Sequence, residues 1–267
     1  MKIGVCVKKV PPSDVRMVIS DDGSSVDGSV YSRLEANPYD EHALEAAVAL
    51  KDQGVASEVI LITFDKPDKP TEKQIISFLG CGADRAVIVS NDELGESELD
   101  ALGVAKVLKA VVDEEGIQAV FCGQQSTDGN SAAVPAMLAE LLQWPYCPLI
   151  TKLECEDEEF TVWTDIGAGS RAVIKTSAPS LFSCDKGLNK PRSPKLKERL
   201  NAKKKPRAVK SLSDLGLSVD DLAAHTVQQN WTLPTKRDSC KFIDLNDSPQ
   251  TAVNELVRLL REEAKVI

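Results

Sequence analysis

The sequence predicts an α/β fold built on a doubly wound, mostly parallel sheet. Short aliphatic runs alternate up to Leu142 with longer segments whose apolar residues fall on one helical face. Of the 267 residues, 42% are hydrophobic but only 4% are aromatic, so Val, Ile, Leu and Ala must form most of the core. Strands that are buried on both faces of a parallel sheet typically have this aliphatic composition.

The elements of this first part are expected in strict alternation. The predicted strands are residues 2–7, 58–64, 86–89 and 119–122, and the predicted helices are residues 37–51, 71–79, 99–115 and 131–142. An exposed loop or hairpin is expected at 11–27, with Asp21-Asp22-Gly23 as its turn. Alternating strands and helices predict crossover connections between parallel strands.

The pattern changes after Pro145. Strand-like segments at 161–163 and 172–175 accompany an acidic stretch at 154–159 that is typical of a hairpin tip, and 180–184 is a candidate further strand. Short helical turns are expected at 211–222, followed by an extended arm at 223–246. A helix at 247–265 ends the sequence, with Ser248 as its N-cap and Pro249 in its first turn.

Charge and cysteine spacing exclude several classes of protein. A net charge of −9 argues against nucleic-acid binding, which needs basic surface. The seven cysteines form no Cys-x-x-Cys pair and the two histidines lie far apart, which argues against a metal site or a disulfide framework. No apolar run approaches the length of a membrane span and no export signal begins the sequence, so a cytoplasmic protein is expected.

A catalytic constellation is not recognisable in the sequence. With only His42 and His225 there is no convincing Ser/His/Asp or Cys/His arrangement, and the carboxylates show no spacing that indicates an acid–base pair. These observations favour a binding protein over an enzyme with its own catalytic residues.

The most informative segment is the loop Gly-Gln-Gln-Ser-Thr-Asp-Gly-Asn-Ser at 123–131. It follows a strand, opens a helix and is rich in hydroxyls, amides and backbone donors, which phosphate oxygens require. It matches neither the Walker loop nor the Gly-x-Gly-x-x-Gly fingerprint. The alternative interpretation is a polar turn in which Asn130 or Ser131 caps the helix.

A basic segment at 195–207 contains two large apolar residues, Leu196 and Leu200, one helical turn apart. A leucine among lysines suits a small, transient docking site for an acidic partner, because clustered charge accelerates encounter. The alternatives are a solvated charged face and a leucine that packs into the domain.

Several motifs together resemble the beta subunit of electron transfer flavoproteins. They are Val-Cys-Val-Lys-Lys-Val at 5–10, Asn-Pro-Tyr-Asp-Glu-His-Ala-Leu-Glu-Ala-Ala at 37–47, Gly-Ala-Asp-Arg at 82–85, Gly-x-Gln-Ser-x-Asp at 123–128, Trp-Pro at 144–145, Leu-Asn-Lys-Pro-Arg at 188–192, Ala-Lys-Lys-Lys at 202–205 and Ser-Asp-Leu-Gly-Leu at 213–217. Each motif is weak alone, but they occur in the same order over nearly the whole chain.

The resemblance implies an adenine-nucleotide alpha-hydrolase-like fold and a heterodimer with an alpha subunit that holds most of the redox FAD. Residues 1–222 would be the nucleotide-binding domain, with a recognition loop at about 188–207, and 223–267 would wrap onto the alpha subunit. Tyr39 would lie near the flavin, and Leu196 would dock acyl-CoA dehydrogenase-like donors of fatty acid beta-oxidation, with a quinone-linked or other redox acceptor downstream. The implied AMP contacts are Cys6, Asn37, Pro38, Tyr39, Asp40, Phe64, Gly123, Gln124, Gln125, Ser126, Thr127, Asp128, Gly129, Asn130, Ser131, Ala132, Ala133 and Val134.

Two departures from the family pattern leave the nucleotide open. Many AMP-binding members carry amide and hydroxyl side chains where this chain has Ala132-Ala133-Val134, while Gly129 and Asn-Pro-Tyr-Asp at 37–40 resemble the branch that binds a second FAD and bifurcates electrons. Trp-Pro and Ala-Lys-Lys-Lys resemble the ordinary branch. AMP is favoured over a second FAD, and a stand-alone ATP- or AMP-binding module is the third alternative.

Overall fold

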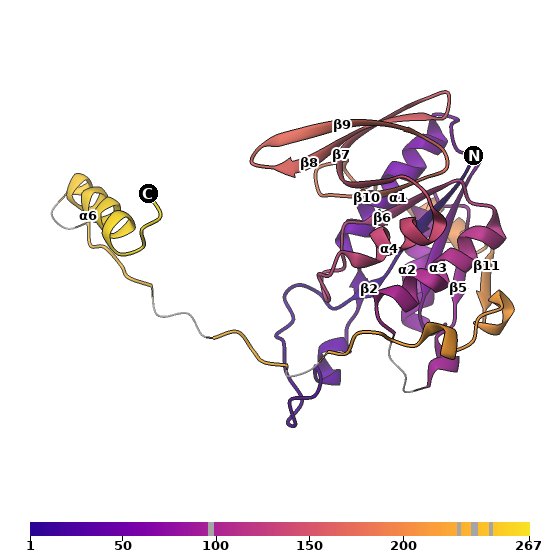
Figure 1. Ribbon diagram of the computed structural model, residues 1–267, viewed down its shortest axis with the longest axis horizontal. Coiled ribbons are helices and arrows are strands. Elements are labelled where there is room, and N and C mark those ends of the chain that lie inside the picture. The colour runs from indigo at the N-terminus through magenta and orange to yellow at the C-terminus, as the bar shows by residue number, and fades with distance from the viewer. Residues whose placement is uncertain (96–98, 229–230, 236–239, 246–247) are drawn as a thin grey trace. The chain divides into compact units, whose positions relative to one another are not determined.

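The computed structural model describes residues 1–95, 99–228, 231–235, 240–245 and 248–267. Contacts divide the chain into two units, Met1–Trp231 and Thr232–Ile267. The first contains the sheet and the helices that cover it (Figure 1). The second contains one helix, α6 (Pro249–Glu262), which begins at the predicted cap because the Ser248 hydroxyl accepts a hydrogen bond from the Thr251 amide.

Nine strands of the described residues form one sheet in the order β11-β5-β4-β1-β6-β10-β7-β8-β9. The strands are β1 (Lys2–Cys6), β4 (Glu58–Phe64), β5 (Arg85–Val89), β6 (Ala119–Gly123), β7 (Tyr146–Glu156), β8 (Glu159–Gly167), β9 (Ser170–Ser177), β10 (Ser180–Cys184) and β11 (Arg207–Lys210). All neighbours from β11 to β7 pair in parallel, and β7, β8 and β9 pair antiparallel. The predicted mostly parallel α/β sheet is therefore confirmed.

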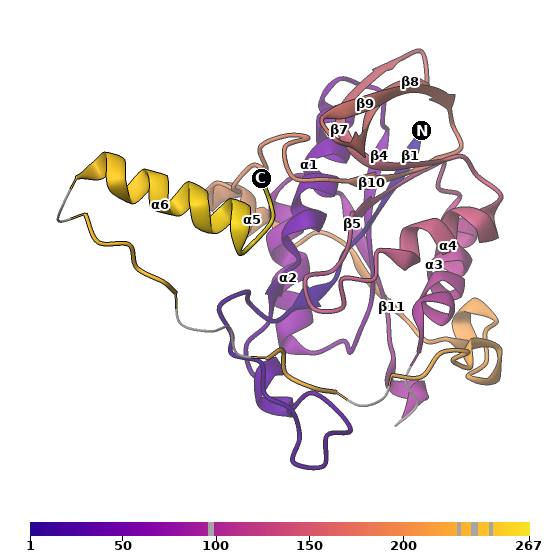
Figure 2. The same cartoon turned by 60° about the vertical axis from the view of Figure 1, so that its left-hand side comes forward.

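Helices cover both faces of the sheet, as Figure 2 shows. Alternate residues of β4 explain this: Val59 and Leu61 pack with α1 (Pro38–Asp52) and α2 (Lys69–Gly80), whereas Ile60 and Ile62 pack with α3 (Ala101–Glu115) and α4 (Ala133–Leu142). A strand apolar on both faces needs a helical layer on each side to exclude water from it.

The chain starts in the middle of the sheet, and this fixes where a ligand can bind. From β1 the chain proceeds outward through β4 and β5, and then α3 returns it to β6 on the other side of β1. The winding of the chain thus reverses between β1 and β6, which makes their carboxyl ends the switch point of the sheet. Such a switch point is the usual ligand site of doubly wound sheets.

Several elements differ from the sequence-based expectation. Helix α2 starts at Lys69, two residues early, because the Asp68 carboxylate caps the Thr71 amide at 2.9 Å. Strands β8 and β9 extend well beyond the predicted segments, and the acidic hairpin turn at Asp157-Glu158 joins β7 to β8. Strand β11 was not predicted, because its Arg-Ala-Val-Lys sequence is short and directly continues the basic segment.

The remaining elements are short strands and helical turns. A short antiparallel pair joins β2 (Lys9–Val10) to β3 (Glu35–Ala36), and the bridge Ile19–Val26 confirms a hairpin within the predicted loop at 11–27. The short helical turns are η1 (Gly28–Tyr31), η2 (Asp92–Leu94), η3 (Ser213–Leu215) and η4 (Asp220–Leu222), the last two in the segment where turns were expected. Among the described residues, no helix is long and apolar enough to cross a bilayer.

Candidate functional site

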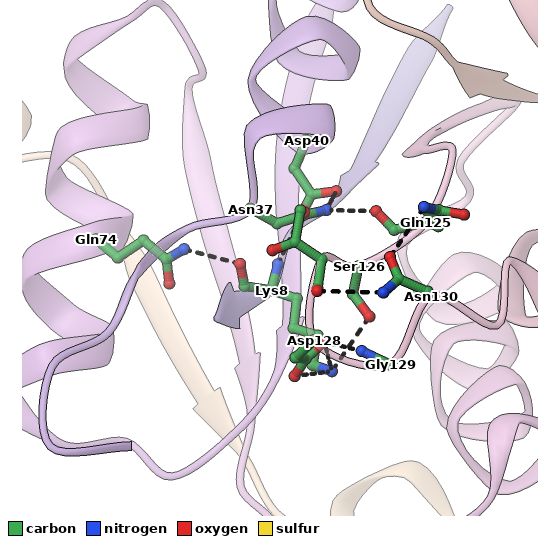
Figure 3. A network of polar contacts seen from close by, with 10 residues as sticks. Lys8, Asn37, Asp40, Gln74, Gln125, Ser126, Asp128, Gly129 and Asn130 are labelled. Atoms are coloured by element: carbon green, nitrogen blue, oxygen red, sulfur yellow. Dashed lines mark hydrogen bonds and ion pairs between the residues drawn. The ribbon is translucent and has the colours of Figure 1, made fainter. Parts of the chain in front are cut away.

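The segments that follow β1 and β6 meet the start of α1 at the switch point of the sheet. Figure 3 shows Lys8, Asn37 and Asp40 facing the loop that runs from Gln125 to Asn130. Most of the predicted nucleotide contacts thus come from three segments that the fold brings to one edge of the sheet, at the carboxyl ends of its central strands.

The Asp40 side chain contacts all three of these segments. Its carboxylate accepts hydrogen bonds from the Lys8 amide at 2.7 Å and from the Asn37 side-chain amide at 2.8 Å, and the Gly123 amide also donates to it. Only 5% of the residue is exposed. Burial raises the pKa of Asp40 to about 7, although the three hydrogen bonds favour the charged form.

Gly123 is the residue that permits this close approach. A Cβ atom at position 123 would overlap the Asp40 carboxylate and would lie 2.7 Å from the Cβ of Tyr39. Any side chain there would push the start of α1 away from the end of β6. The glycine that ends β6 is therefore required by packing at the site and not by a turn.

Asn37 joins the start of α1 to the loop after β6. Its side-chain nitrogen donates to the Asp40 carboxylate and to the Gln125 carbonyl, the latter at 2.9 Å. Its side-chain oxygen is buried and has no hydrogen-bond partner within the described residues. A buried acceptor without a partner is costly, so this atom lacks a donor that the described residues do not supply.

The loop after β6 is held in a compact turn by its own polar side chains. The Asn130 amide donates to the Ser126 carbonyl at 2.9 Å, and the Gln125 side chain donates to the Asn130 side chain at 2.9 Å. The Lys8 ammonium lies 2.8 Å from the Asp128 carboxylate and anchors the loop to β1. This ion pair and its neighbouring hydrogen bonds lower the pKa of Asp128, against the opposing effect of its burial.

The start of α4 corrects the interpretation of this loop as a simple capped turn. Neither Asn130 nor Ser131 caps the helix, because the N-cap is Ala132, which has a φ of 52° and no side chain that can accept a hydrogen bond. Consequently the first backbone N–H groups of α4 lack a capping side chain. Free N–H groups at a helix N-terminus can bind an anion.

Tyr39 lies at the edge of this arrangement. The Lys186 ammonium lies over its ring, 4.8 Å from the ring centroid, which is within the range of a cation–π contact. The adjoining segment is fixed to α1 as well, because the Asn189 side chain donates to the His42 carbonyl at 2.9 Å. Lys186 therefore places a positive charge beside the site.

Phe64 and Leu196 are among the predicted residues that lie outside this cluster of polar contacts. Phe64 ends β4 and packs with the apolar residues below α3 and α4. Leu196 begins α5 (Leu196–Ala202), which contacts α2, and 76% of it is exposed, while Leu200 is 55% exposed. The alternative that Leu196 packs into the domain is therefore wrong for this chain.

Sequence reasoning missed two lysines at the site. Lys8 was quoted only as part of a motif, although a lysine directly after a strand that borders a polar loop is a recognisable signal for anion binding. Lys186 follows β10 and could not be assigned before the sheet order was known. Neither the described histidines and cysteines nor the acidic side chains gather into a group of three or more that could hold a metal ion.

Known proteins match the whole length of this chain. The electron transfer flavoprotein domain matches residues 30–215. The chain belongs to the electron transfer flavoprotein beta-subunit family. A protein of Bradyrhizobium diazoefficiens called electron transfer flavoprotein subunit beta is 34% identical over the full length of both chains, and one of Bacillus subtilis with the same name is 33% identical, also over both full lengths.

Relatives from other lineages have the same name. A mitochondrial electron transfer flavoprotein subunit beta of Oryza sativa subsp. japonica is 32% identical over both full lengths, and one from Syntrophomonas wolfei is 29% identical over all of this chain and 98% of its own. Membership of this family implies a role in flavoprotein electron transfer and a heterodimer with an alpha subunit.

Proposed function

We propose that this chain carries electrons as the beta subunit of a heterodimer, with FAD at the interface with the alpha subunit and AMP bound structurally at the candidate site. The observation that supports a nucleotide phosphate here is the uncapped start of α4, which follows the loop that the Lys8 ammonium contacts through Asp128. Backbone N–H groups and a nearby cation are what a phosphate group requires.

The residues at the site fit an adenine nucleotide. Ala133 and Val134 offer backbone N–H groups to a phosphate, whereas Pro135 has none, so backbone donors replace the side-chain donors that this loop lacks. The buried side-chain oxygen of Asn37 suits an amino or hydroxyl group of the nucleotide. Cys6 and Phe64, at the ends of β1 and β4, would supply apolar surface to the base.

The redox chemistry would belong to the FAD, which accepts and donates electrons when it is bound. The role of this chain would be to position the flavin and shield it from solvent. Tyr39 would present its ring toward the flavin, and Lys186 beside it would contribute a positive charge that favours an electron-rich neighbour. No residue of this chain needs to bond covalently to a substrate in that role.

A second FAD in place of AMP is the alternative that the start of α4 favours. Ala132, Ala133 and Val134 are small or apolar, so they leave room for a larger ligand and impose no side-chain donor that selects a monophosphate. Gly129, which carries no side chain, widens the same loop. The chain would then belong to an electron-bifurcating flavoprotein.

The basic helix α5 would dock the electron donor. Leu196 is exposed in a segment that also carries Lys195 and Lys197, so it offers an apolar contact inside a positive field. An acyl-CoA dehydrogenase-like donor with an acidic surface would fit this combination, and electrons would then pass to a quinone-linked or other redox acceptor.

The C-terminal arm at 223–267 would bind the alpha subunit. Within α6, Val253, Leu256 and Val257 are exposed side chains at helical spacing, which is a face that a partner would bury. Residues 1–222 would then act as the nucleotide-binding domain.

Purification of the heterodimer with its alpha subunit, followed by extraction and chromatography of the bound nucleotides, tests these proposals. One FAD and one AMP per heterodimer would support the first proposal, and two FAD would support bifurcation. A self-sufficient monomer that turns over ATP would overturn both and would indicate a stand-alone nucleotide-binding module.

A further inference from the structure

Two cysteines lie side by side on adjacent strands at the base of the candidate site. Strands β1 and β6 pair in parallel with Gly4 opposite Val120 and Val5 opposite Phe121, so the next pair toward the site is Cys6 and Cys122. Both side chains pack with the apolar residues between the sheet and helices α3 and α4. The two thiols therefore extend from neighbouring backbone positions toward the same face.

This spacing suits a disulfide. Neighbouring strands lie about 4.7–4.9 Å apart, which falls within the separation of about 4.4–6.8 Å between the α-carbons of bonded cysteines. A side-chain hydrogen bond with Cys6, together with burial, raises the pKa of Cys122. Cys122 therefore holds its proton, and it is only 4% exposed, whereas Cys6 is partly exposed and is the thiol that a reagent meets first.

The other cysteines lack such a partner. All seven are free thiols. Cys147 and Cys184 pack on the opposite face of the sheet, and Cys184 pairs with Gly123 and not with Cys122. The Cys6–Cys122 pair is thus distinguished by its register and by its position at the end of the central strands.

We propose that Cys6 and Cys122 form a modification site, a dithiol that becomes an intramolecular disulfide by exchange with a low-molecular-weight disulfide. The Cys6 thiolate attacks one sulfur of the reagent and releases the other half as a thiolate. Cys122 then gives up its proton to the released thiolate, attacks the Cys6 sulfur and releases the second half as a thiolate. The protein loses two electrons and two protons, and the reagent disulfide gains both to become two thiols.

The bond would act directly on the candidate site. Cys6 lies two residues before Lys8, whose amide donates to Asp40, and Cys122 precedes Gly123, which contacts the same carboxylate. A covalent link would fix the two strand ends and remove the Cys6 thiol from the site. The expectation that a nucleotide protects Cys6 rests on the proposed function, whereas the disulfide does not.

Peptide mapping of the oxidised heterodimer tests the pair. The protein is incubated with oxidised glutathione, its remaining thiols are alkylated, and tryptic peptides are analysed without reduction. We expect a cross-link between the peptide Ile3–Lys8 and the peptide Ala110–Lys152. Because the second peptide also contains Cys147, the Cys147→Ala variant must keep the cross-link, and the fragment spectrum must place it on Cys122.

The Cys122→Ala variant separates the two steps. It lacks the resolving thiol, so it should retain glutathione on Cys6, while the wild-type protein should not accumulate this adduct. The proposal would be overturned if Cys6 and Cys122 of the wild-type protein both remained free thiols after oxidation. A cross-link from Cys6 to Cys147 would also overturn it. These wild-type results decide the matter even if the variant folds poorly.

A final arm of the experiment distinguishes this inference from the proposed function. With AMP at ten times its dissociation constant, disulfide formation should slow about tenfold, because only about a tenth of the sites stay empty. A disulfide that forms at the same rate with AMP bound would support the dithiol and remove Cys6 from the nucleotide site. If AMP binds but no disulfide forms, the nucleotide site is supported and the dithiol is overturned.

Discussion

The side-chain nitrogen of Asn37 lies 2.9 Å from the carbonyl oxygen of Gln125 and joins two segments that are 88 residues apart in the sequence. The same nitrogen donates to Asp40, so one amide group connects the start of α1, the end of β1 and the loop after β6. Asn37 and Asp40 together therefore hold the three segments of the candidate site.

Replacement of Asn37 by Ala should therefore weaken the site. It removes one donor from the Asp40 carboxylate, which keeps those of Lys8 and Gly123, and the side-chain donor of the partly buried Gln125 carbonyl, which we expect to lower the free energy of unfolding by about 1–3 kcal/mol. It also removes the free side-chain oxygen, so the dissociation constant for AMP should rise at least ~10-fold. Urea unfolding and titration calorimetry measure the two effects.

The control is Asn201→Ala, which removes an exposed asparagine of α5. It should change neither stability nor AMP affinity by a measurable amount. Equal effects of the two substitutions would contradict the role assigned to Asn37.

Stability should depend on pH through Asp40. Its pKa is raised from 3.8 in the ordinary state to about 7 by burial, so the folded protein binds this proton more tightly than the unfolded chain does. The free energy of unfolding must then fall as the pH rises from about 4 to about 7. Between pH 6 and pH 8 the titration of Asp40 should lower the free energy of unfolding by about 1 kcal/mol.

Urea unfolding at pH 6 and pH 8 checks this dependence, with Asp40→Asn as the comparison. The variant is expected to be less stable at both pH values, because an amide cannot accept all three hydrogen bonds. The decrease in the free energy of unfolding between pH 6 and pH 8 that Asp40 causes should be absent from it. An identical loss in both proteins would assign the pH dependence to other groups.

Lys8→Ala should affect binding more than folding. Its side chain is 54% exposed, so the ion pair with Asp128 contributes about 1 kcal/mol or less to stability. Loss of its charge should raise the dissociation constant for AMP by about 10-fold and should reduce the dependence of binding on salt concentration. Titrations at low and high salt measure both effects.

The Lys66→Ala variant is the matched control, because it removes an exposed lysine from the loop after β4. It should leave the affinity for AMP unchanged. A salt dependence that is the same in Lys8→Ala and in the wild-type protein would argue that Lys8 does not face the phosphate.

Leu196→Ala should leave folding and FAD content intact and slow the reduction of the flavin by the donor dehydrogenase. The side chain is 76% exposed, so truncation leaves no cavity. An anchor at the centre of a docking surface commonly contributes about 2 kcal/mol, which corresponds to a ~30-fold lower kcat/KM for the donor. Stopped-flow reduction measures this rate.

The control for Leu196 is Val209→Ala, which shortens an exposed apolar side chain on β11. Donor kinetics should not change in that variant. Unaltered kinetics in Leu196→Ala would place the docking surface elsewhere.

Assembly with the alpha subunit should depend on the apolar face of α6. Leu256→Asp puts a charge on that face, where burial in an interface would be costly, so the dissociation constant of the heterodimer should rise at least ~100-fold. Asn254→Asp adds the same charge elsewhere on the helix and should have little effect. Analytical ultracentrifugation distinguishes the two, and equal heterodimer formation in both variants would rule out this face.

Much of the fold could be predicted because strand periodicity is local. The aliphatic run Glu58–Phe64 was predicted with its bounds, and the first unit has the predicted alternation of strands and helices. The hairpin strands β8 and β9 were underestimated, because one face of each is exposed and their apolar signal is weak. Strand β11 carries Arg and Lys at its ends, and only pairing with β5 defines it.

The sequence by itself determined the α/β class, the polar loop at 123–131 and, through its motifs, the family. Only the tertiary structure decided that Asp40, Asn37 and Lys8 face that loop, that α4 starts without a cap and that Cys6 stands beside Cys122. Periodicity and composition describe which residues are neighbours along one element. The order of strands in the sheet, which depends on long-range packing, decides which elements meet, and a site at a switch point exists only once that order is known.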